Sequence, residues 1–84
     1  MNRMYNLPWL SRNLEVIDST DPTLIGISGV VMDETKRTII IQTSNNEITM
    51  AKDKIRFTIE EEEIIGSMVG QRPEERIGKR YRRS

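Results

Sequence analysis

The sequence predicts an all-β fold, a small, strongly bent antiparallel barrel of about five to six strands. Apolar and polar residues alternate with a period of two almost throughout, as in strands that bury one face. Turn-forming residues interrupt these runs every 8–12 positions or so, which is typical of sandwiches and barrels. With 84 residues, the chain has the length of one domain.

The predicted strands follow an N-terminal arm in which Pro8 interrupts any helix. Two expected turns are Thr20-Asp21-Pro22 and Asn45-Asn46, the second a tight hairpin because asparagine tolerates positive φ. Residues 38–43 contain three consecutive isoleucines, which indicates a central strand. The strands are predicted at residues 14–19, 27–33, 38–43, 47–51 and 55–59, with a short run at Ile64 and Ile65 that closes at Gly66.

The C-terminal segment has a different character. Pro73 suits the first position of a helix, and Glu74 and Glu75 suit its first turn because they oppose the positive end of the helix dipole. Gly78 limits this helix to about two turns. We therefore divide the chain into an arm (1–13), a barrel (14–70) and a basic C-terminal helix or tail (71–84).

The composition excludes several kinds of chemistry. The chain contains no cysteine and no histidine, so zinc, iron–sulfur and blue-copper sites and the usual nucleophilic triads are not expected. Only carboxylate sites for hard cations remain open. No apolar run approaches the roughly 18 residues of a membrane span, and residues 1–10 lack the features of a secretion signal. These observations predict a cytoplasmic protein without a cofactor of its own.

Charge is distributed unevenly although the formal net charge is zero. Residues 72–84 hold six basic and two acidic residues, whereas the rest of the chain holds seven basic and eleven acidic ones. A basic tail is a common means of binding phosphate, but it can equally be a solvated end.

Most of the other basic residues fall in two clusters. Lys36 and Arg37 lie in the predicted loop after the second strand, and three more bracket the start of the fifth. Each cluster alone can be an ordinary polar segment. The tail and these two clusters contain every basic residue of the chain except Arg3 and Arg12. We therefore expect them to form one interface for RNA phosphates. Its predicted members are Lys36, Arg37, Lys52, Lys54, Arg56, Arg72, Arg76, Lys79, Arg80, Arg82 and Arg83.

Three further features have structural and functional interpretations. Gly26-Ile27-Ser28-Gly29 matches a G-x-x-G pattern that clamps RNA in KH domains, but there the loop joins helices. Here it enters a strand, so we expect Gly26 to end a turn and Gly29 to let the strand bend. The four glutamates 60–63 cannot converge on one ion within a strand and indicate a solvated edge. Trp9 either caps the core or anchors a partner.

The segment from Ser19 to Thr35 (STDPTLIGISGVVMDET) resembles the signature of archaeal ribonuclease P protein component 1. The resemblance continues with a Thr-then-aliphatic strand (38–41), Lys52 ahead of the strand that carries Phe57, Gly66, and Arg72-Pro73-Glu74-Glu75-Arg76. It covers about residues 14–80. One departure is Ser11-Arg12-Asn13, where the family often has a small apolar and glycine segment; Asn13 is expected to supply the left-handed conformation.

This resemblance implies an Sm-like barrel that is a non-catalytic subunit of the ribonucleoprotein removing 5′ leaders from precursor tRNA. It implies that the RNA subunit carries the catalytic Mg²⁺, and that a small zinc-ribbon protein subunit is a partner. By analogy the RNA-facing positions are Lys36, Arg37, Lys52, Arg72, Arg76, Lys79 and Arg80, and the partner-facing ones are Leu7, Trp9 and Leu10. Gly26, Gly29, Gly66 and Pro73 are expected to be structural.

Two other functions remain open from the residues alone. An Sm-like homo-oligomeric ring would pair edge strands between subunits. A ribosomal SH3-like barrel protein would share the same strand pattern. An independent enzyme is least favoured, because no catalytic constellation is evident.

Overall fold

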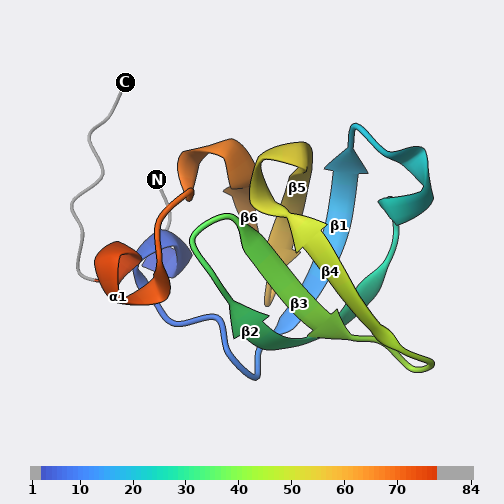
Figure 1. Cartoon of the computed structure of the whole chain (residues 1–84), viewed down its shortest axis with the longest axis horizontal. Helices are drawn as coiled ribbons and strands as arrows, with labels where there is room; N and C mark the ends of the chain where they lie inside the picture. The colour runs from blue at the N-terminus through green and yellow to red at the C-terminus, as the bar shows by residue number, and fades with distance from the viewer. Residues whose placement is uncertain (1–2, 78–84) are drawn as a thin grey trace.

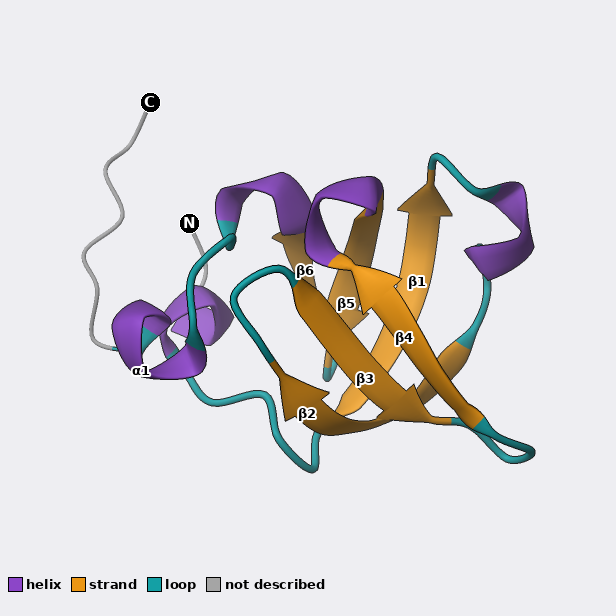
Figure 2. Ribbon diagram, viewed as in Figure 1, coloured by secondary structure: helices purple, strands orange, loops and turns teal. Residues whose placement is uncertain are grey.

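The structure, a computed structural model, describes residues 3–77. Within these residues, six antiparallel strands form one sheet in the order β4-β3-β2-β1-β5-β6 (Figure 1). The sheet bends so strongly that β3 and β4 lie in front of β1 and β5 (Figure 2). This confirms the predicted fold class. The strands are β1 (Asn13–Ser19), β2 (Ser28–Glu34), β3 (Thr38–Gln42), β4 (Glu47–Ala51), β5 (Ile55–Ile59) and β6 (Glu62–Ile65).

Short helical turns connect the strands and cover the ends of the barrel. Between residues 3 and 77, four of these turns are 3₁₀ turns, and α1 (Pro73–Arg76) is a single α-helical turn. None of the helices in the described part of the chain is both long and apolar enough to cross a bilayer. The 3₁₀ turns are η1 (Arg3–Asn6), η2 (Pro22–Leu24), η3 (Lys52–Lys54) and η4 (Gly66–Met68).

Two irregularities in the sheet allow it to bend. The register shifts between Val16 and Asp18 in β1, and between Val31 and Asp33 in β2. A bulge of this kind strengthens the local twist. Gly29 lies close to β3, and a Cβ there would stand only 2.4 Å from the Gln42 carbonyl oxygen. The close approach of β2 to the end of β3 therefore requires glycine at this position.

The core lies inside the bent sheet. In β5, Ile55, Phe57 and Ile59 point inward, in keeping with the alternation read from the sequence. The Trp9 and Phe57 rings meet edge to face with centroids 5.4 Å apart, a favourable arrangement for aromatic pairs. The buried apolar residues are Met4, Tyr5, Trp9, Leu14, Val16, Val31, Ile39, Ile41, Met50, Ile55, Phe57, Ile59, Ile64 and Val69.

The N-terminal arm is part of this core. The Trp9 indole donates to the Met4 carbonyl at 2.9 Å. The arm then runs beside β2, where the Ser11 amide donates to the Val31 carbonyl at 2.8 Å. The left-handed residue in this segment is Ser11 (φ 67°) and not Asn13, which begins β1. The expectation for Asn13 was therefore wrong by two positions.

The tight hairpin is also at a different place from the one predicted. Asn45 and Asn46 do not adopt positive φ; their loop is held by the Thr43 hydroxyl, which donates to the Asn46 carbonyl at 2.9 Å. The two-residue turn joins β5 to β6 instead. There Glu60 (φ 49°) and Glu61 (φ 75°) are both left-handed.

The C-terminal helix is shorter than expected. We predicted about two turns, but α1 has four residues, with Ile77 as its C-terminal cap. The Glu75 carboxylate accepts from the Arg72 amide at 3.1 Å and so caps the N-terminal end. Four predicted RNA contacts (Lys79, Arg80, Arg82 and Arg83) lie outside the described residues.

Candidate nucleic-acid interface

A buried carboxylate organises two of the predicted RNA-binding cations. Glu34, the last residue of β2, receives the Arg76 guanidinium side-on, with Nη2–Oε1 at 2.6 Å and Nε–Oε2 at 2.9 Å. The Lys52 ammonium donates to the same Oε2 at 2.9 Å. All three residues are buried, Arg76 completely. We call Glu34, Lys52 and Arg76 the Glu34 cluster.

Each cation in the Glu34 cluster has further partners. Arg76 Nη1 donates to the Tyr5 and Leu7 carbonyls, and its guanidinium carbon lies 3.6 Å from the centroid of the Trp9 ring. Lys52 Nζ donates to the Gln71 carbonyl at 2.8 Å. Burial lowers the pKa of Lys52, and Glu34 opposes this shift. Within residues 3–77, no buried side-chain polar atom lacks a hydrogen-bond partner, as an ion cluster of this kind requires.

These positions correct the expectation that Lys52 and Arg76 face RNA. Their charges are directed inward, where they tie the arm, β2 and the C-terminal segment together. Trp9, a candidate partner contact, is likewise fully buried and serves the core. Leu7 packs against the core, whereas Leu10 is 52% exposed and can meet a partner.

Sequence reasoning missed Glu34 because the predicted second strand ended at Asp33. The β2 bulge turns both Val31 and Glu34 inward, which a strict period of two does not allow. One signal was present. The Asp-Glu-Thr segment, Lys52 and the Arg-Pro-Glu-Glu-Arg segment, which together carried the family resemblance, contribute the three members of the cluster.

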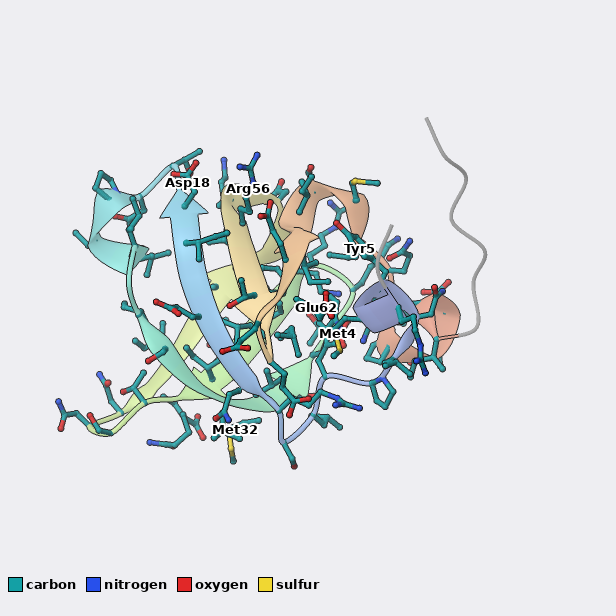
Figure 3. The ribbon with its side chains drawn as sticks, turned by 180° about the vertical axis from the view of Figure 1, so that it is seen from behind. Met4, Tyr5, Asp18, Met32, Arg56 and Glu62 are labelled. Atoms are coloured by element: carbon teal, nitrogen blue, oxygen red, sulfur yellow. The ribbon has the colours of Figure 1, made fainter. Side chains whose placement is uncertain are left out.

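The remaining predicted cations within the described residues are exposed. Lys36 and Arg37 occupy the β2–β3 loop, Lys54 ends η3, Arg56 lies in β5, and Arg72 precedes α1. Arg56 has a carboxylate partner, Glu63, at 3.6 Å. Arg56 also pairs in register with Asp18, and Figure 3 shows both at one end of the barrel, with Met32 at the other.

Two hollows lie on either side of η3 and share Asp53 and Ser67. One, of about 230 Å³, includes Lys54 and Arg56 in its lining. The other, of about 330 Å³, includes Arg37. The β2–β3 loop, η3 and η4 are gathered at one end of the sheet (Figure 2). We call this surface, with Lys36, Arg37, Asp53, Lys54, Arg56 and Ser67, the η3 edge.

The four glutamates 60–63 lie in the β5–β6 turn and in β6, where Glu63 reaches Arg56 of the η3 edge at 3.6 Å. Glu60 accepts from Arg12 at 2.6 Å. Across the described part of the chain, no group of three or more acidic side chains is arranged to hold a metal ion.

Comparisons with known proteins agree with the resemblance seen in the sequence. Residues 9–79 match the family described as ribonuclease P/MRP, subunit p29. Ribonuclease P protein component 1 of Methanosphaera stadtmanae is 36% identical over 78 residues, covering 87% of this chain and 84% of the relative. The protein of that name from Nitrosopumilus maritimus is 35% identical, covering 83% of this chain and 84% of the relative.

A solved structure is also similar. It is described as Mth11, a homologue of human RNase P protein Rpp29, and matches with a TM-score of 0.60 and 34% identity, over 84% of this chain and 99% of that one. Fold and surface define the class of small bent β-barrel proteins with a cationic edge. Within that class, the chain belongs to the ribonuclease P/MRP subunit p29 family.

Proposed function

We propose that this chain is a non-catalytic protein subunit of ribonuclease P and binds its RNA subunit through the η3 edge. One observation supports the proposal that RNA contacts the η3 edge. Lys36, Arg37 and Lys54 are exposed there and form no ion pair within residues 3–77. In contrast, Arg12, Lys52, Arg56 and Arg76 each have a carboxylate partner.

The contacts are expected to read phosphates and shape more than base identity. Tyr5, Trp9 and Phe57 are buried, so their rings are not available for stacking with bases. Exposed lysine and arginine side chains instead neutralise phosphates and release counterions. In this proposal the RNA subunit and its Mg²⁺ perform the cleavage of precursor tRNA in the cytoplasm, and the protein supplies affinity and RNA folding.

The test measures binding of the ribonuclease P RNA to the full chain at several salt concentrations. Lys36→Ala and Lys54→Ala should each weaken binding and lower the salt slope by about 1. Asn45→Glu is the matched control, since it changes the net charge by the same amount in the exposed β3–β4 loop. Affinity that does not depend on salt, or equal effects of all three variants, would contradict the proposal.

A second protein of the complex is proposed to bind the opposite end, and the small zinc-ribbon subunit is the expected partner. Leu10, Val30 and Met32 are exposed apolar side chains on the arm and on the β2 segment beside it. Met32→Glu should abolish co-purification of that subunit while leaving RNA affinity unchanged. Lys36→Ala and Lys54→Ala should instead weaken RNA binding and leave co-purification of that subunit unchanged.

A further inference from the structure

The larger hollow beside η3 is built from three segments that are distant in sequence. Arg37 and Thr38 come from the β2–β3 loop and the start of β3, residues 51–53 come from the end of β4 and η3, and the third wall is formed by Gly66, Ser67 and Gly70. Most of the lining consists of short side chains or backbone. Arg37, Asp53 and Ser67 supply a cation, a carboxylate and a hydroxyl.

Lys52 fixes all three walls in place. Its backbone amide donates to the Arg37 carbonyl at 2.8 Å, and its ammonium donates to the Gln71 carbonyl at 2.8 Å. Gly66 lies so close that a Cβ there would overlap the Lys52 carbonyl oxygen. Since Lys52 is buried and paired with Glu34, the hollow is formed before any ligand arrives. Pre-organisation of this kind lowers the entropic cost of binding.

The charges around the hollow match a nucleotide. Arg37 at one side and Lys54 across the shared residues Asp53 and Ser67 can hold successive phosphates. Between these cations, the Asp53 carboxylate can accept hydrogen bonds from the N–H groups at a base edge. The hollow lies within the η3 edge, so an RNA strand held there by its backbone passes directly over it.

We propose that this hollow binds one unstacked nucleotide of the RNA. Its base presents two adjacent N–H donors to the Asp53 carboxylate, as guanine does with N1–H and its exocyclic amino group. The inference rests on the proposed RNA-binding function and adds a single-stranded element to it. A continuous A-form helix would contact the same cations without entering the hollow.

Gly70 offers a direct test. It lines the hollow, a Cβ there would meet no atom within 4 Å, and its φ is not positive, so a side chain is tolerated. Gly70→Leu should fill the space and weaken binding of the ribonuclease P RNA about tenfold, the order of one lost base contact. It should also expose one nucleotide that the wild-type protein protects from base-specific chemical modification. Ser44→Leu, in the exposed β3–β4 loop, is the control.

Asp53→Asn is the second variant and needs no extra volume. It should reduce the preference for guanine over adenine at the protected nucleotide and leave the salt slope unchanged. Wild-type affinity and wild-type protection in both variants would overturn the proposal that the hollow binds a nucleotide. The proposal that the η3 edge binds RNA would still stand. If the wild-type chain itself binds the RNA without salt dependence, the proposed function fails and the hollow fails with it.

Discussion

At the scale of single residues, the Glu34 cluster holds the N-terminal arm and α1 on the barrel. One carboxylate faces two cations, and Arg76 reaches both the arm and the Trp9 ring. An ion pair removed from water stabilises a protein only when each charge is compensated. The loss of Glu34 would leave two buried cations without a counter-charge, whereas the loss of either cation would leave one pair intact.

We therefore expect Glu34→Gln to lower the free energy of unfolding by roughly 3–5 kcal/mol, the range for breaking a buried ion pair. Urea unfolding followed by the fluorescence of Trp9, the only tryptophan, measures this change. Glu74→Gln is the control, because Glu74 is exposed in α1. A loss below about 1 kcal/mol, as for an exposed pair, would show that Glu34 does not hold the cluster.

Lys52 makes stability depend on pH in the alkaline range. Burial lowers the pKa of Lys52 in the folded protein below its ordinary value of 10.5. Between these two values the unfolded chain binds more protons than the folded one, so stability rises as pH rises through the folded-state pKa. Lys52→Met removes this contribution. The difference in unfolding free energy between wild type and Lys52→Met should therefore shift in favour of wild type as pH increases towards 10.5.

At the scale of elements, the β5–β6 hairpin carries local strain. Glu60 and Glu61 are both left-handed, a conformation that costs a side-chain-bearing residue about 1–2 kcal/mol. The turn exists because Ile59 and Ile64 are buried on either side of it and fix the register. Burial of the flanking strands thus outweighs the preference of the turn residues.

Glu61→Gly should raise the free energy of unfolding by about 0.5–1 kcal/mol, because glycine adopts positive φ without steric cost. Thermal unfolding gives the change. Glu62→Gly, one residue later and within β6, should instead destabilise the protein, since glycine weakens a strand. Equal effects of the two substitutions would mean that the left-handed turn is not strained.

At the scale of the whole molecule, the edge strands of the sheet are where a second copy of the chain could pair. Within residues 3–77, β4 and β6 each pair with only one strand. The Tyr5 hydroxyl accepts from the Ile65 amide at 2.9 Å and occupies part of the β6 edge. Glu62 and Glu63 add negative charge along the same strand. Such features discourage pairing between sheet edges.

We therefore expect the isolated chain to be a monomer. Size-exclusion chromatography with light scattering measures its mass, for which the sequence gives 9.8 kDa. An Sm-like ring would instead give about six or seven times this value by edge-strand pairing. A ring abolished by Ile65→Pro would identify β6 as its interface.

Much of the fold could be predicted from the sequence. All six strands appear at or within a few residues of their predicted positions, because period-two alternation and turn residues are local signals. We predicted the tight hairpin turn at Asn45-Asn46, but it lies at Glu60-Glu61. The register between β5 and β6 outweighs the conformational preference of asparagine for such turns. The exposed positions of Lys36, Arg37 and Lys54 were also foreseeable, since polar loops lie on the surface.

The sequence by itself determined the barrel class, the arm and the uneven distribution of charge along the chain. Only the tertiary structure decided which charges reach the surface. Glu34 lies 18 residues from Lys52 and 42 from Arg76, and no local pattern predicts that the three converge. A charge is buried when the fold brings a compensating partner, so its location depends on long-range contacts and not on the residue type alone.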